Sequence, residues 1–223
     1  MSIIKNIIMV IKLFNTPLYI GNGSLCDIFK ICIISPNIII HEFSHCIMAK
    51  LCGREVTGII IELTRGYIKC YIDKYNNVDR LVLASGYVGE TITLTSIMPI
   101  LDKIYDSCNS SLIKILCVTI NAFIYLNNCE VITCVLEQLY YSNTKIYKTT
   151  DFARLKNTSS YITILSSVLT LSYCLFSSAY RFSEKISEKK IYIVSSLIAI
   201  LIRNHYKDKH LLETILSEKK LKK

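Results

Sequence analysis

Several residue types are scarce or absent in this chain of 223 residues. It contains no tryptophan, only three prolines and only seven glycines. This composition excludes a Pro/Gly-rich disordered segment over most of its length. No low-complexity tract and no repeat of fixed period occurs, which excludes a repeat architecture. Only the final segment, LSEKKLKK, departs from this pattern, and it predicts a solvated basic tail over residues 211–223.

Cysteine pairs with metal-ligand or redox spacing are also absent. The chain has ten cysteines, but none forms a Cys-x-x-Cys pair, and most lie inside apolar runs. A chain of this length also fits poorly with a small disulfide framework. We therefore expect the cysteines to be small buried hydrophobes in a reducing or lipid-buried setting.

The excess of positive charge is not gathered on one basic face. The formal net charge is +9, but Lys and Arg occur in short segments between apolar runs, without interleaved aromatic residues. Nucleic-acid partners are therefore not expected. Loops that face anionic lipid headgroups explain the distribution better.

Long apolar runs are the main positive feature. Hydrophobic residues make up 52% of the chain and the mean hydropathy is +0.40. A helix that spans a bilayer needs roughly 20 mostly apolar residues in a row, and several runs of the chain approach that length. We predict an integral multi-pass membrane protein with four to six segments, of undetermined orientation and organelle. The run at 112–139, interrupted by NNCE, predicts one broken helix or two short ones. The candidates are residues 161–182, 81–101, 112–139 and 25–51, then 3–20, which would span or lie in the interface, and the short run 191–202.

One region breaks the helical pattern. Residues 55–75 are rich in β-branched and aromatic side chains and carry Arg65 and Gly66 near their centre, which predicts a β-hairpin. Gly53, just before it, suits the left-handed end of a preceding helix. The predicted fold is therefore mainly α: a polytopic helical membrane protein with a small hairpin. We expect one membrane-embedded domain over residues 1–210.

The segment HEFSH supplies the clearest chemistry. His41 and His45 are four residues apart, so on a helix both imidazoles lie on one face and can reach one metal ion. Glu42 is placed to take a proton from water at that metal, as a general base. Only four histidines occur in the chain. Ionisable groups inside a membrane segment are functional candidates by default.

This segment also resembles a known family. The run HEFSHCIMAKLCGREVTGIIIE (residues 41–62) resembles the motif of the site-2-protease class of intramembrane zinc metallopeptidases, the M50 family. Their motif helix is followed by a glycine and a β-hairpin. The run LASGYVGETI (residues 83–92) resembles the G-Y-x-G segment of the compact M50B-like branch. The resemblance implies a zinc cofactor and hydrolysis of peptide bonds in membrane-embedded substrates.

The third zinc ligand is less defined by the sequence. The resemblance implies Asp151, because KTTDFARLKN is similar to an aspartate-containing segment of the M50B-like branch, although its spacing is shorter and the late Asp-Gly of site-2 proteases is absent. Asp151 would also serve simply as a helix N-cap. Glu130, inside an apolar run, is the rival ligand. Glu90 is a third candidate, or it orients a ligand histidine from outside the coordination sphere.

Three functional hypotheses follow from these features. The first is an intramembrane zinc metalloprotease acting on membrane-protein or peptide substrates, with the bilayer as its other partner and an unknown oligomeric state. The second is a catalytically inactive M50-like membrane scaffold or interaction protein, motivated by the departure around Asp151. A soluble zincin ranks last, because the apolar residues around the motif leave little polar helix face.

Overall fold

The computed structural model describes residues 10–13, 16–20, 36–62, 66–71, 76–144 and 150–188. Within these ranges the chain is mainly helical and carries one small sheet, as predicted. The antiparallel hairpin directly after the motif helix is also confirmed. The elements are β1 (Val10–Leu13), β2 (Thr16–Ile20), α2 (Pro36–Leu51), β3 (Val56–Ile61), β4 (Gly66–Cys70), α3 (Asn77–Ser107), α4 (Ser111–Tyr140), α5 (Asp151–Asn157) and α6 (Tyr161–Glu188).

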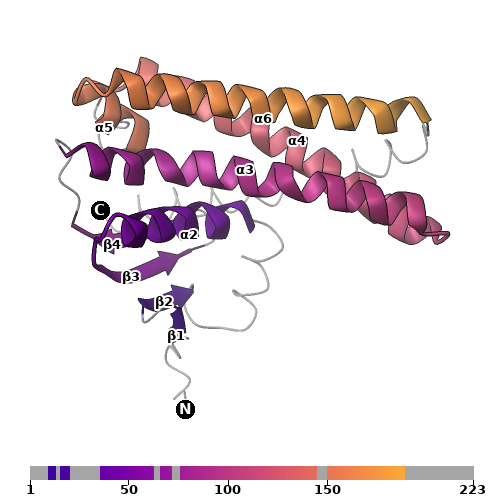
Figure 1. The fold of residues 1–223 in the computed structure, drawn as a ribbon, viewed down its shortest axis with the longest axis horizontal. Coiled ribbons are helices and arrows are strands. Elements are labelled where there is room, and N and C mark those ends of the chain that lie inside the picture. Colours follow the sequence, from indigo (N-terminus) through magenta and orange to yellow (C-terminus); the bar gives the residue numbers. More distant parts are fainter. Residues whose placement is uncertain are drawn as a thin grey trace, which may run out of the picture.

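Three long helices, α3, α4 and α6, lie side by side and form the largest layer of the fold (Figure 1). Each is long and apolar enough to cross a bilayer, and they contain the predicted segments 81–101, 112–139 and 161–182. The NNCE sequence does not interrupt α4, which is one continuous helix. One face of α6 is apolar and exposed, as on a helix that contacts lipid. Its members are Ile162, Leu165, Leu169, Tyr173, Phe176 and Tyr180.

The motif helix α2 lies between α3 and the sheet (Figure 1). Its sheet-facing side is buried with Cys46 and Ala49 against Ile59 and Ile61 of β3. The helix ends at Gly53, whose φ of 71° is the left-handed conformation that the sequence predicted there. At 16 residues, α2 is about 24 Å long, less than the ~30 Å hydrocarbon core of a bilayer.

The amino-terminal part of the sheet corrects one prediction. Residues 3–20 were expected to span the membrane or lie in its interface, but their described part forms strands β1 and β2. The strand order is β1-β2-β3-β4, with β2 parallel to β3 and the other neighbours antiparallel. The reason is local: pairing with β3 satisfies the backbone of β2 and buries Leu18 in the core shared with α2. The predicted segment 191–202 and the tail 211–223 lie outside the described residues.

A half-buried ion pair joins the connection between α2 and β3 to α3. Arg54 follows α2 and donates two hydrogen bonds, of 2.6 and 3.0 Å, to the carboxylate of Asp79 in the first turn of α3. The Asp79 side chain is fully buried. This pair fixes the start of α3 beside the end of α2, at the same end of the bundle as α5 (Figure 1).

Candidate metal centre

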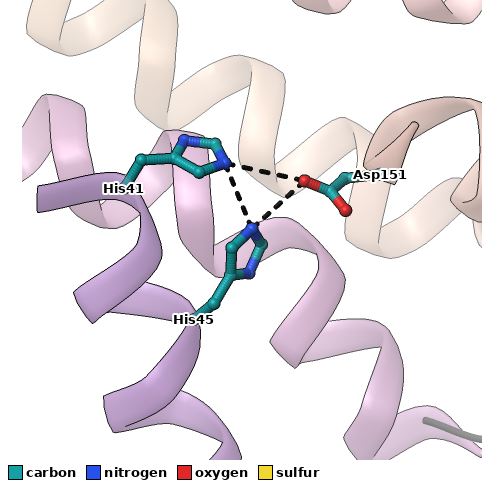
Figure 2. A group of neighbouring side chains, drawn as sticks. All are labelled: His41, His45 and Asp151. Atoms are coloured by element: carbon teal, nitrogen blue, oxygen red, sulfur yellow. Dashed lines mark hydrogen bonds and ion pairs between the residues drawn. The ribbon is translucent and has the colours of Figure 1, made fainter. Parts of the chain in front are cut away.

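His41 and His45 point the same way from one face of α2, as their spacing predicts (Figure 2). Their Nε2 atoms are 3.1 Å apart, and the rings meet edge to face with centroids separated by 4.8 Å. His45 is buried and His41 is half-buried. Two imidazole nitrogens thus face one small volume in the interior of the protein.

Asp151 reaches the same volume from a distant part of the chain. Its Oδ2 atom lies 3.1 Å from Nε2 of His45 and 3.7 Å from Nε2 of His41 (Figure 2). Among the described residues these three form the cluster able to hold a metal ion. Asp151 is the first residue of α5 and Thr150 is its N-cap, so the alternative role of Asp151 as an N-cap is wrong.

The outer nitrogens of the two rings have partners that define where the ring protons lie. Nδ1 of His45 is 2.6 Å from the carbonyl oxygen of Val82, which can only accept, so this nitrogen donates. Nδ1 of His41 is 3.1 Å from Oε2 of Glu90 and donates to that carboxylate. In a neutral imidazole the other nitrogen then carries a lone pair. Both Nε2 atoms therefore face the centre as acceptors.

This donor set fits a zinc ion. The two Nε2 atoms and a carboxylate oxygen of Asp151 converge and could all contact one metal ion, and neutral rings with their protons on Nδ1 would direct their Nε2 lone pairs at it. Ligand atoms of a tetrahedral zinc lie about 3.3 Å apart when each is ~2.0–2.1 Å from the metal. The observed separations of 3.1, 3.1 and 3.7 Å bracket that value.

Comparison with known proteins assigns the family. The sequence profile of the Peptidase M50B-like family matches residues 18–170, more than half of the chain. The chain belongs to this family. No curated protein and no solved structure gives a significant match. The matched region contains both motif histidines and Asp151, and membership indicates a metallopeptidase.

Glu42 of this M50B-like chain is buried, with 5% of its surface exposed. It lies on α2 directly after His41 and packs against the first residue of β4. A Cβ atom added at Gly66 would lie 2.9 Å from Oε1 of Glu42, so only glycine leaves room for the carboxylate there. The hairpin that follows the motif helix therefore folds back so that β4 covers Glu42.

Two glycines of α3 bring this helix close to α2. A Cβ atom at Gly86 would lie 2.5 Å from Nε2 of His41 and would also collide with Nε2 of His45. A Cβ at Gly89 would lie 2.5 Å from Oγ of Ser44. Glycines allow helices to pack this closely. Gly86, in addition, leaves open the volume into which both ring nitrogens point.

The two rival carboxylates lie differently. Glu90 is 2% exposed, and its Oε2 accepts from His41 while its Oε1 accepts a 2.8 Å hydrogen bond from Asn127 of α4. Glu90 therefore orients the His41 ring from outside the cluster, which is the second of the two roles considered for it in the sequence. Glu130 lies on α4 with its side chain exposed and is not part of the cluster.

Three further residues contribute to the site but were not predicted as site residues. The Val82 carbonyl holds His45, and the Tyr87 ring packs edge to face on His41 with centroids 4.4 Å apart. Gly66 accommodates Glu42. Tyr87 lies inside the Gly-Tyr-x-Gly segment that carried the family resemblance, so that segment was the available signal for it.

Proposed function

We propose that this M50B-like chain is an integral multi-pass membrane zinc metalloprotease that hydrolyses peptide bonds of membrane-embedded substrates. The observation that carries the proposal is the convergence of two imidazole Nε2 atoms and one carboxylate oxygen beside a buried glutamate. The three long apolar helices support a location in the bilayer.

In this proposal His41, His45 and Asp151 hold the metal. Bound zinc would polarise the scissile carbonyl and lower the pKa of a water molecule. The protein keeps the ligands aimed: Glu90 and the Val82 carbonyl hold the Nδ1 protons, so both Nε2 lone pairs remain directed at the centre.

Glu42 is the proton carrier. It follows His41 on α2, on the side covered by β4, and its burial limits competition from bulk water. Its carboxylate accepts the proton of the attacking water and then gives that proton to the leaving amine. An amide at this position would retain the shape of the side chain but could not accept the proton.

Strand β4 offers a way to present the substrate. A peptide inside a membrane helix has its backbone groups paired internally and must unwind before attack. Among the four described strands, β4 lies at the edge of the sheet nearest Glu42, which contacts its first residue, Gly66. An unwound substrate segment added along β4 would pair its backbone with the sheet and pass beside Glu42.

The test combines metal content with turnover on purified, detergent-solubilised full-length protein. Wild type should hold about one zinc per chain and cleave a single-span membrane peptide. Glu42→Gln should retain the metal and lose cleavage, whereas His45→Ala should lose both. Absence of zinc from wild type would overturn the proposal.

The same experiment separates the protease from an inactive scaffold. The scaffold hypothesis was based on the unusual sequence around Asp151. Because Asp151 lies within the cluster, that sequence no longer favours an inactive protein. A scaffold predicts that wild type and Glu42→Gln behave alike towards every peptide tested. Glu130→Gln is the matched control, because this carboxylate is exposed and remote from the cluster, and it should match wild type.

A further inference from the structure

A buried glutamine on α4 makes hydrogen bonds to two elements of the candidate centre. Gln138 is 2% exposed, within the last turns of an apolar helix. Its Nε2 donates a 2.7 Å hydrogen bond to the hydroxyl of Tyr87 on α3, and its Oε1 accepts a 3.2 Å hydrogen bond from the backbone N–H of Phe152 on α5. A buried amide is costly unless it is paired in this way.

The bond to Phe152 compensates for a missing cap. Helix α5 begins after Thr150, whose side chain makes no capping hydrogen bond. The N–H groups of a first helical turn have no partner within the helix and need one from elsewhere. Gln138 supplies it from α4, at the residue next to Asp151, and so fixes where the first residue of α5 lies.

The bond to Tyr87 extends the connection to the histidines. The Tyr87 ring packs edge to face on His41, with centroids 4.4 Å apart, and lies 6.0 Å from the ring of Phe152. The Tyr87 hydroxyl and the Gln138 amide also both contact Sγ of Cys134, at 3.4 Å each. The Gln138 side chain therefore contacts Tyr87, which packs on His41 of α2, and Phe152, which follows Asp151 on α5.

We propose that Gln138 is a positioning residue for the metal centre: it caps α5 from the neighbouring helix and thereby sets the distance between Asp151 and the two histidines. The inference rests on the proposed metal-binding function and adds to it. Asp151 is brought from 106 residues away, on a helix of only seven residues, so its placement depends on contacts from other helices. Gln138 makes one polar contact of this kind at its amino-terminal end.

The experiment compares three substitutions in the full-length protein. Gln138→Met has similar length but can neither accept from Phe152 nor donate to Tyr87. Gln138→Glu restores the linkage, because one oxygen can accept from Phe152 and the other from the Tyr87 hydroxyl. Lys156→Met is the matched control: it removes another bond between α5 and α4, the 2.7 Å hydrogen bond from Lys156 Nζ to the Leu139 carbonyl, at the far end of α5.

Two readouts are measured: zinc affinity by chelator competition, and the visible spectrum of Co²⁺-substituted protein, which reports the ligand set. Gln138→Met should bind zinc about tenfold more weakly, as when an outer support of a ligand is lost. Its Co²⁺ spectrum should move towards that of Asp151→Ala. Gln138→Glu should recover most of the affinity, and Lys156→Met should remain within about twofold of wild type.

The outcomes separate this inference from the proposed function. If Asp151→Ala loses metal but Gln138→Met keeps the wild-type affinity and spectrum, the positioning role is wrong while the metal site stands. Equal losses in Gln138→Met and Lys156→Met also overturn it, since they indicate general anchoring of α5. If wild type binds no Co²⁺ or Zn²⁺, both proposals fail. If Gln138→Met does not fold, Gln138→Asn replaces it, because the shorter amide is drawn back from Phe152 and Tyr87, and an unchanged Co²⁺ spectrum in that variant refutes the role.

Discussion

A single added methyl group at Gly86 gives the sharpest test of the centre. In Gly86→Ala, the new Cβ would lie 2.5 Å from Nε2 and 2.6 Å from Cε1 of His41, and would also collide with Nε2 of His45. Non-bonded atoms of this kind separate to about 3.5 Å, so each ring must move by about 1 Å. Both rings are held from behind, by Glu90 and by the Val82 carbonyl, and cannot retreat freely.

The expected loss of metal is large compared with the loss of stability. Metal–ligand distances tolerate only about 0.2 Å of variation, so a displacement of about 1 Å should weaken zinc binding by at least about 100-fold, the upper end for disturbed ligand supports. Overpacking of this size destabilises folding by about 1–3 kcal/mol. The assay is chelator competition for zinc, together with thermal unfolding of the same detergent-solubilised sample.

Gly58 in β3 provides the matched glycine control. A Cβ added there would lie 3.5 Å from its nearest neighbour, Cε2 of Tyr19, which is an ordinary contact. Gly58→Ala should therefore bind zinc like wild type. If Gly86→Ala remains folded and binds zinc within about threefold of wild type, a difference of under 1 kcal/mol, then the space beside Gly86 does not hold the metal and the geometric argument is refuted.

Three further predictions concern the supports of the site. Glu90→Gln should weaken zinc binding by about tenfold, because it weakens the hold on the His41 Nδ1 proton, while Glu130→Gln should leave chelator-competition curves unchanged. Arg54→Met should lower stability by about 3 kcal/mol, because it removes both hydrogen bonds that Arg54 donates to the buried Asp79 carboxylate; an unchanged denaturation midpoint would contradict this. Ile68→Pro in the edge strand should slow peptide cleavage with zinc content unchanged, and equal cleavage rates would exclude strand addition at β4.

The motif helix and its hairpin were predictable because their signals are local. The spacing of His41 and His45 already requires one helix face, and Gly53 marks the helix end. The β-branched run after it predicts strands. Each of these inferences depends on residues within about one turn of each other, so no knowledge of the tertiary fold was needed.

The third member of the cluster was not fixed by local signals. Asp151, Glu130 and Glu90 are all carboxylates near or within apolar runs, and sequence periodicity does not say which face of a long helix turns inward. In the structure Asn127 faces Glu90, whereas Glu130, three residues later, has an exposed side chain. That distinction depends on how α4 packs against α3 and α6. Metal ligation by Asp151 stays a prediction.

The amino-terminal strands were missed for a related reason. The run at 3–20 is apolar enough to suggest a membrane segment, but the described part of it pairs with β3 through contacts such as Leu18 with Ile59. Ile59 lies 41 residues after Leu18 in the chain. A search for apolar runs does not detect a pairing partner at that distance.

The separation between His45 and Asp151 has a consequence for biosynthesis. His41, Glu42 and His45 are made first, and Asp151 follows 106 residues after His45. At ordinary rates of translation that interval is about 5–20 s. During it, the nascent chain carries the motif helix without the Asp151 carboxylate. The cluster of His41, His45 and Asp151 can be completed only after α3 and α4 have been synthesised and α5 has docked, so metal binding by all three residues would have to wait until the bundle is assembled.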